Sequence, residues 1–195
     1  MHAILLDRDG VINCERADYV KSWHEFHFLP GVLPALRRLA TLAVPIAVIT
    51  NQSAIGRGII EPATVAEIHN RLRKTVFDAG GRLDAFFVCP HHPSTGCGCR
   101  KPKPGLLVQA AEQLDFSLKH SVFIGDTITD FEAARAAGCH AILVKSGLQG
   151  AHLDQLFSDA KLPPPFLPPP IVEDLSTAVD LLVHDGLNRP TVLSF

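Results

Sequence analysis

The chain has 195 residues, of which 47% are hydrophobic and 19% charged, and its formal net charge is −2 at pH 7. This composition suits one folded domain, spanning 1–195, with a sizeable core, and excludes an intrinsically disordered chain. The small net charge gives no electrostatic reason to expect a nucleic acid or a membrane surface as partner.

The N-terminus and the cysteine content bear on the compartment. MHAILLDRDG lacks the positive segment of a signal peptide, and no stretch approaches the roughly 20 apolar residues of a membrane span. The five cysteines, an odd number, fit a reducing environment better than a disulfide framework. We therefore expect a cytoplasmic protein.

Strand-like and helical segments alternate along the chain. Short apolar runs predict strands at 3–7, 45–51, 85–90, 121–126 and 140–144. Helical spacing of apolar residues predicts helices at 31–43, 62–80, 104–115 and 129–138, with Thr129 as a candidate cap of the last. The alternation predicts right-handed β-α-β units, and hence an α/β fold with a mostly parallel sheet covered by helices on both faces.

The C-terminal part departs from this alternation. Residues 147–175 have the character of an insertion, and KLPPPFLPPP (161–170) is typical of polyproline II. A final helix is predicted at about 173–186. We expect the Pro-rich segment to be a spacer that returns this helix to the sheet; packing at the rim of the site and docking of a neighbour stay open as alternatives.

Polar residues follow three of the predicted strands. Asp7 and Asp9 follow the first, Thr50 and Asn51 end the second, and Asp126 ends the fourth. In open α/β sheets, ligands bind beyond the carboxyl ends of the strands, so these residues can share one crevice. Three carboxylates there would repel one another unless a cation neutralised them, and Mg²⁺ prefers such oxygen ligands. A solvated turn is the alternative for the two N-terminal aspartates.

The same residues can carry out a phosphoryl transfer. A carboxylate such as that of Asp7 can attack phosphorus and form an aspartyl phosphate. A second carboxylate, that of Asp9, can protonate the leaving oxygen and then activate water. Thr50, the backbone N–H of Asn51 and Lys101 are candidates for binding the other phosphate oxygens.

The order DRDGV, TN, a lysine and GDTITD resembles the four motifs of the haloacid-dehalogenase-like (HAD) phosphatases. The resemblance covers residues 3 to about 145 and implies a Rossmann-like three-layer sandwich. It implies that Asp7 is the nucleophile and Asp9 the general acid and base, with Thr50 and Lys101 on the phosphate. It further implies that Mg²⁺ is held by Asp7, by Asp126 and by the backbone carbonyl of Asp9, and that Asp130 supports this site. The chain lacks an insertion long enough for a large cap domain, so an open site is expected.

A second cluster lies in the stretch CPHHPSTGCGCRKPKPG (89–105). Cys89, His91, Cys97 and Cys99 give the spacing C-x-H-x5-C-x-C, which suits a closed tetrahedral Zn²⁺ site in the loop 89–103. No ligand is left over for a water molecule, so the zinc is expected to be structural. His92 is an alternative ligand, and a set of reduced thiols is the alternative to a metal site.

The combination of motifs resembles the group that contains the D-glycero-D-manno-heptose-1,7-bisphosphate 7-phosphatases and the histidinol-phosphate phosphatases. TNQSAIGRG (50–58) and CPHHP look like the heptose branch, and ERADYV (15–20) occupies the place of that branch's substrate loop with one residue more. The resemblance implies substrate contacts from Glu15, Arg16, Asp18, Tyr19, Asn51, Gln52, Ser53, Arg57, Arg100 and Lys101. Removal of the 7-phosphate of the heptose bisphosphate is the expected activity, and hydrolysis of histidinol phosphate is the alternative.

One residue departs from the pattern of the heptose enzymes, and one other class of function stays open. Thr127 stands where the heptose enzymes often have a lysine after Gly-Asp, so one anion contact is missing. A non-enzymatic zinc module that binds nucleic acid is the remaining alternative, but only Arg100, Lys101 and Lys103 supply positive charge beside the cysteines. We expect a small phosphorylated metabolite as the partner of a monomer, without nucleic acid or membrane.

Overall fold

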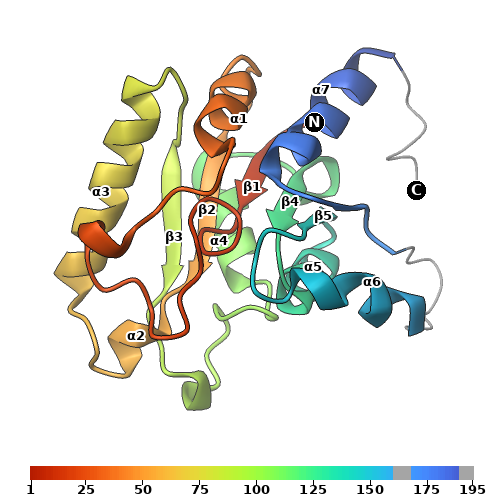
Figure 1. Ribbon diagram of the computed structural model, residues 1–195. Coiled ribbons are helices and arrows are strands. Elements are labelled where there is room, and N and C mark those ends of the chain that lie inside the picture. Colours follow the sequence, from red (N-terminus) through yellow and green to blue (C-terminus); the bar gives the residue numbers. More distant parts are fainter. Residues whose placement is uncertain (160–167, 189–195) are drawn as a thin grey trace.

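The computed structural model describes residues 1–159 and 168–188 (Figure 1). Its strands form one six-stranded sheet in the order β3-β2-β1-β4-β5-β6. The strands are β1 (Ile4–Leu6), β2 (Ile46–Asn51), β3 (Ala85–Cys89), β4 (Val122–Gly125), β5 (His140–Val144) and β6 (Ile171–Val172). Neighbouring strands in the described ranges all pair in parallel, so their carboxyl ends meet at one edge of the sheet.

Helices cover both faces of the sheet, as the alternation of elements predicts. The α-helices are α1 (Val32–Leu39), α2 (Ser53–Gly56), α3 (Pro62–Asp78), α4 (Gly105–Leu114), α5 (Ile128–Ala137), α6 (Gly150–Asp159) and α7 (Leu175–Asn188). Short 3-10 helices are η1 (Trp23–Glu25), η2 (Pro93–Thr95) and η3 (Leu118–His120). Among the described residues, no helix is both long and apolar enough to cross a membrane.

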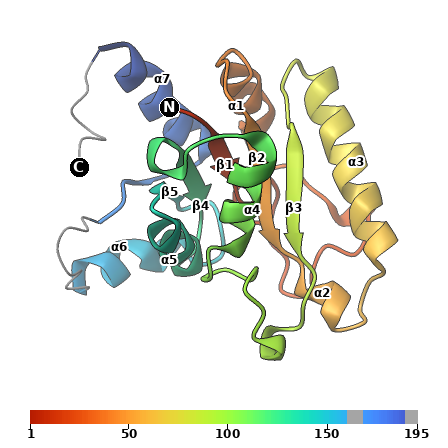
Figure 2. The same cartoon turned by 180° about the vertical axis from the view of Figure 1, so that it is seen from behind.

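The alternation of side chains along β1 divides the core into two parts. Ile4 and Leu6 lie in the core beneath α1, α3 and α7, the helices in front of the sheet in Figure 1. Leu5 points the other way and lies in the core beneath α4 and α5, which Figure 2 shows from the opposite side. This follows from the two-residue period of a strand, and it fixes the direction of the residues that come directly after β1.

The five strands and four helices predicted before residue 145 are confirmed, with shifts at their ends. The structure ends the helix predicted at 31–43 at Leu39. It also begins α5 at Ile128 with Thr127 as the cap, so the expectation for Thr129 is wrong. The reason is a reciprocal capping arrangement, in which Asp130 accepts hydrogen bonds from the backbone N–H and the hydroxyl of Thr127.

The region after residue 146 contains elements that the sequence analysis does not predict. Helix α6 packs Leu153 and Phe157, which lie four residues apart, against Phe131 and Leu143. Strand β6 extends the sheet beside β5. The polyproline II prediction falls mainly on residues 161–167, which lie outside the described residues. The last helix does return to the sheet, because α7 contributes to the core beneath α1.

Candidate active site

A cavity of about 340 Å³ opens at the carboxyl edge of the sheet. Its volume suits a small metabolite. It is lined by Asp7, Arg8, Asp9, Glu15, Arg16, Ala17, Tyr19, Val20, Thr50, Asn51, Gln52, Ser53, Arg57, Pro93, Arg100, Lys101, Asp126, Thr127 and Thr129. The structure therefore brings the ends of β1, β2 and β4 together, as predicted, with the loop before α4.

Asp7 and Lys101 form the buried centre of the cavity. The Lys101 ammonium lies 2.8 Å from the Asp7 carboxylate and 2.7 Å from that of Asp130, and it donates to the carbonyl of Ile49. Burial raises the pKa of Asp7 to about 7 even though the charge of Lys101 opposes this. Burial alone would lower the pKa of Lys101, but the charges of Asp130 and Asp7 outweigh it and raise that pKa. The lysine is therefore a fixed cation beside the candidate nucleophile.

Asp126 is a buried carboxylate, and neither of its side-chain oxygens has a hydrogen-bond partner among the residues that the structure describes. Burial, followed by the charges of Asp130 and Asp7, raises its pKa to about 9. Carboxylate oxygens of Asp7, Asp126 and Asp130 all lie within 4.8 Å of one another. A group of carboxylates at one cavity, of which Asp126 has no donor for either oxygen among the described residues, fits a hard divalent cation.

Two glycines leave room for this cluster. A β-carbon on Gly10 or on Gly147 would overlap the Asp126 carboxylate, so both loops can approach the carboxylate only as glycine. Gly10 also has a φ of +80°, which disfavours other residues. Asp130 is set back from the cavity and is occupied by Lys101 and by backbone N–H groups of Asp126 and Thr127, which agrees with a supporting position.

Asp9 is held as an acceptor by three side chains. Arg8, Asn13 and Gln52 each donate to its carboxylate at 2.9 Å. Burial would raise the pKa of Asp9, but the charge of Arg8 and these hydrogen bonds outweigh it and lower that pKa. Gln52 also donates to the Thr50 hydroxyl, so it connects the two motifs.

The sequence analysis did not single out two of the donors to Asp9, Arg8 directly before it and Asn13 four residues after it. For Arg8 the available signal was the strand period. Asp7 continues the row of Leu5, so Arg8 continues the row of Leu6, on the α3 side of the sheet.

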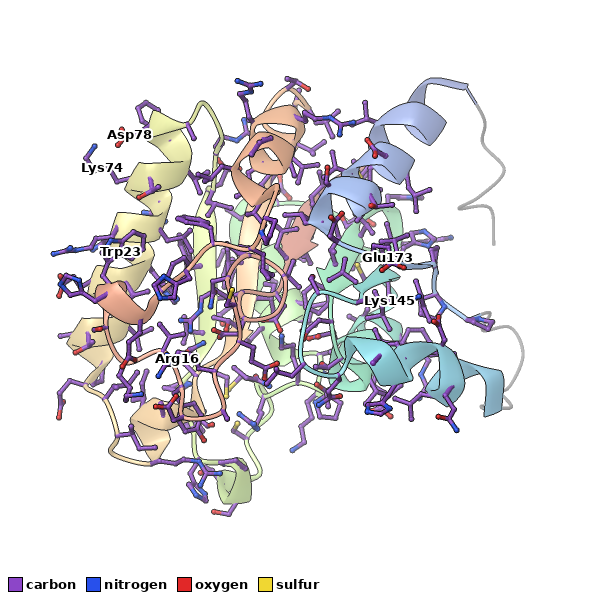
Figure 3. The ribbon with its side chains drawn as sticks, viewed as in Figure 1. Arg16, Trp23, Lys74, Asp78, Lys145 and Glu173 are labelled. Carbon is purple, nitrogen blue, oxygen red and sulfur yellow. The ribbon has the colours of Figure 1, made fainter. Side chains whose placement is uncertain are left out.

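The loop between β1 and α1 brings most of its predicted contact residues to the cavity. Glu15, Arg16 and Tyr19 line it, and Figure 3 shows Arg16 within this loop. Asp18 does not line the cavity: it is exposed and forms ion pairs with Arg16 at 3.0 Å and with Lys21 at 2.6 Å. Asp18 thus holds the arginine in place instead of facing the cavity itself.

Asn51 and α2 connect the second strand to the loop that precedes α4. The Asn51 side chain donates to the carbonyl of Lys101 and accepts from its N–H, both at 3.2 Å. Ser53 and the exposed Arg57 line the cavity from α2. Gly56 of the same helix lies against the backbone of His91 and His92, where a β-carbon would not fit.

The predicted cysteine cluster is assembled. Ligand atoms of Cys89, His91, Cys97 and Cys99 lie within 4.8 Å of one another. Cys99 Sγ is 3.4 Å from Cys89 Sγ and 3.5 Å from Cys97 Sγ, close to the edge of about 3.8 Å of a tetrahedron with Zn–S bonds of about 2.3 Å. Nδ1 of His91 is 3.2 Å from Cys99 Sγ, whereas His92 contacts the Ser94 hydroxyl instead.

Comparison with known proteins places this geometry in a family. The model of the HAD-hydrolase-like family matches residues 98–178. A D-glycero-β-D-manno-heptose-1,7-bisphosphate 7-phosphatase of Pseudomonas aeruginosa is 45% identical over 144 residues, which are 74% of this chain and 81% of that protein. A D-glycero-α-D-manno-heptose-1,7-bisphosphate 7-phosphatase of Mycobacterium bovis is 38% identical over 167 residues, covering 79% of this chain and 85% of the relative.

A solved structure gives the same result. The D,D-heptose 1,7-bisphosphate phosphatase of B. bronchiseptica, complexed with magnesium and phosphate, superposes with a TM-score of 0.86 at 37% identity. The alignment covers 95% of this chain and 99% of that one. The identity and coverage of these relatives confirm the resemblance drawn from the motifs. The chain belongs to the HAD-like family of hydrolases, as a phosphatase of the group that contains the heptose bisphosphate phosphatases.

Proposed function

We propose that this chain is a Mg²⁺-dependent phosphomonoester hydrolase that removes the 7-phosphate of D-glycero-D-manno-heptose 1,7-bisphosphate through an aspartyl-phosphate intermediate. The observation that carries the proposal is the set of Asp7, Asp9, Lys101 and Asp126 around one cavity, in which Asp9 is half-buried and the other three are buried. The names of the relatives at 37–45% identity support the heptose substrate over histidinol phosphate. A nucleic-acid-binding zinc module would have no use for this carboxylate set.

In the proposed reaction, a carboxylate oxygen of Asp7 attacks phosphorus in line with the leaving sugar oxygen. The P–O bond to the sugar breaks with its electron pair on that oxygen, which takes a proton from Asp9; in this proposal the anionic phosphate bound beside Asp9 raises its pKa so that it carries that proton. Asp9 then accepts a proton from a water molecule that hydrolyses the aspartyl phosphate. Lys101, Thr50 and the N–H of Asn51 stabilise the charge of the transferring group.

The unpartnered Asp126 oxygens support a Mg²⁺ site made by Asp126, Asp7 and the carbonyl of Asp9, with Asp130 behind it. When bound, Mg²⁺ supplies positive charge that allows the anionic phosphate to approach the carboxylates. In the absence of the ion, the raised pKa values of Asp7 and Asp126 reflect how unfavourable their ionised forms are.

The rest of the cavity suits a second phosphate and several hydroxyl groups. Arg16, Arg57 and Arg100 place positive charge around it, and Glu15, Gln52 and Ser53 offer hydrogen-bonding groups. Thr127 leaves one side of the cavity without a cation, so the arginines of the loops carry the distal phosphate in this proposal. Tyr19 supplies an apolar surface beside the sugar.

The proposed Zn²⁺ at Cys89, His91, Cys97 and Cys99 is structural. The four-residue set is supported by its near-tetrahedral spacing. The ion would fix the loop that delivers Arg100 and Lys101 to the phosphate. A monomeric state and a cytoplasmic location stay predictions.

The test is a side-by-side measurement of kcat/KM with Mg²⁺ for both anomers of the heptose bisphosphate and for L-histidinol phosphate. We expect kcat/KM for the better heptose anomer to exceed that for L-histidinol phosphate by about 100-fold or more. This ratio corresponds to about 2.7 kcal/mol of transition-state discrimination. A preference for histidinol phosphate would contradict the substrate and leave the reaction type in place. Hydrolysis of none of the three would contradict the proposal as a whole.

A further inference from the structure

Arg8 is a buried cation on the side of β1 away from the nucleophile. Only 1% of the residue is exposed. Its NH2 group donates to the Asp9 carboxylate, with contacts of 2.9 Å to Oδ1 and 2.8 Å to Oδ2. The guanidinium therefore touches the candidate general acid but is directed away from Asp7, toward α3.

His69 lies behind this arginine. Nε2 of His69, a residue of α3 with 6% exposure, is 3.3 Å from NH1 of Arg8. An arginine can only donate, so Nε2 must be the unprotonated acceptor. Burial and the nearby charge of Arg8 lower the pKa of His69 to about 3, which agrees with a neutral ring.

One aromatic side chain fixes the plane of the histidine ring. His69 stacks on Phe86 of β3, with ring centroids 4.6 Å apart and planes 18° apart. Arg73, one turn along α3, lies over the same phenyl ring at 5.1 Å from its centroid. The series Phe86, His69, Arg8 and Asp9 thus runs from β3 through α3 to the reacting end of the cavity.

We propose that His69 is a positioning residue for the proton-transfer step: it fixes the guanidinium of Arg8, which in turn fixes the carboxylate of Asp9. The proposal rests on the assignment of Asp9 as general acid in the proposed function. It is a statement about orientation, because Asp9 can serve the leaving oxygen only if its carboxylate is held in the correct plane.

The contacts explain why an acceptor is needed at this position. Nε of the buried Arg8 has no hydrogen-bond partner, so Asp9 and His69 are the side chains that orient the guanidinium within the described part of the chain. Without the acceptor at His69, NH1 would be a second unpartnered donor group in a closed site. The cost of that arrangement favours rotation of the guanidinium, and the Asp9 carboxylate would rotate with it.

Two substitutions separate positioning from packing. His69→Phe keeps a ring to stack on Phe86 but removes the acceptor. His69→Gln loses the ring but keeps a side-chain oxygen that can reach NH1 of Arg8. Arg73→Gln is the matched control, because Arg73 is another neighbour of the Phe86 ring and is not part of the series that reaches Asp9.

The readout compares two leaving groups in single-turnover experiments with Mg²⁺. Release of the sugar from the heptose bisphosphate requires a proton, whereas p-nitrophenolate leaves from p-nitrophenyl phosphate without one. We expect His69→Phe to slow sugar release about 10- to 100-fold and p-nitrophenol release by less than about 3-fold. His69→Gln should restore most of the sugar release, and Arg73→Gln should match the unmodified chain on both substrates.

Asp9→Asn, measured alongside, distinguishes the possible failures. If Asp9→Asn slows both substrates equally, the assignment of Asp9 in the proposed function is wrong. If Asp9→Asn discriminates between them but His69→Phe does not, the positioning inference is overturned. The inference is also overturned if His69→Gln is impaired more than His69→Phe, because that order indicates ring packing. Thermal unfolding of each variant checks that the fold is kept, and the ratio of the two rates remains informative if stability falls.

Discussion

The aspartate cluster and the cysteine cluster are both arranged to hold a cation, but the chain builds them differently. Asp7, Asp126 and Asp130 are buried at the ends of strands and at the start of α5. Of the cysteine cluster, Cys89 is buried at the end of β3, whereas His91 is exposed and Cys97 and Cys99 lie in a long loop. The first cluster is held by the sheet whether or not an ion is present. The second would depend on its ion for its own geometry.

The two ions would therefore control different properties of the molecule. The aspartates are packed by the hydrophobic core, so the ion there would affect charge and catalysis. The cysteine loop has little core of its own, so the ion there would contribute folding free energy. Asn51 connects the two clusters, because its two hydrogen bonds hold the backbone of Lys101 at the end of the cysteine loop.

Asp7→Asn should produce the largest separation of activity from stability. We expect kcat to fall by about 10⁴-fold or more, because the nucleophile is lost. Stability without metal should stay equal or rise, because an ionised carboxylate with a pKa raised by burial is replaced by a neutral amide. Steady-state kinetics and thermal unfolding measure the two effects. Near-normal activity would rule out Asp7 as the nucleophile.

Cys97→Ser should show the opposite pattern. We expect zinc content to fall from about one per chain and the unfolding free energy to drop by about 2–5 kcal/mol, with activity lost only as the loop loosens. Metal analysis and denaturant unfolding are the measurements. Cys14→Ser is the matched control, because Cys14 is exposed and lies outside both clusters. Retention of one zinc per chain in Cys97→Ser would show that the ligand set is wrong.

Gly147→Ala tests whether the close approach of residue 147 to the Asp126 carboxylate is needed for the proposed Mg²⁺ site. A β-carbon here would overlap the Asp126 carboxylate, so we expect the affinity for Mg²⁺ to fall about 10- to 100-fold. The activation of hydrolysis by increasing Mg²⁺ measures it. Gly98→Ala in the cysteine loop is the control, because its β-carbon would meet nothing within 4 Å. Equal Mg²⁺ affinity in the two variants would contradict the close fit.

The smallest expected effect is a pH dependence confined to the aspartate cluster. The pKa of Asp7 is raised from 3.8 to about 7, and that of Asp126 from 3.8 to about 9. Between 3.8 and the raised pKa of each group, the folded state binds more protons than the unfolded state. Stability of the metal-free chain should therefore fall as pH rises from about 4 to about 9, and its Tm should fall with it. Calorimetry in the presence of a chelator measures this slope. Saturating Mg²⁺ and Asp126→Asn should each reduce the slope, and a slope that neither changes would have another origin.

Some parts of the fold and of the site can be predicted from the sequence, and others cannot. The strands, the layers and the meeting of Asp7, Thr50 and Asp126 could be inferred from the sequence, because hydrophobic period and parallel pairing dictate them. Helix α6 is not evident from the sequence of 147–175, which lies beside a proline-rich run. Its signal, an apolar pair four residues apart, is weak in a short segment.

The details of the site depended on contacts between distant segments. That Arg8 meets His69 across 61 residues, and that Asp18 turns away from the cavity to bind Arg16 and Lys21, cannot be read from local pattern. His91, by contrast, is the ligand that the sequence analysis predicts, with His92 as the alternative, and its Nδ1 lies beside Cys99 Sγ while His92 contacts Ser94. Figure 3 also shows Lys145 beside Glu173, an exposed pair at 3.3 Å that only the course of the C-terminal region could reveal.

The packing of α7 has a consequence for the order of events during synthesis. Leu175, Ala178 and Val179 lie in the same core as Ile4 and Leu6 of the first strand. When β1 leaves the ribosome, α7, which packs in the same core as β1, has not yet been translated. The growing chain must therefore keep this apolar surface exposed until residues 175–182 have emerged. The core around the first strand is completed only when the last helix packs onto it.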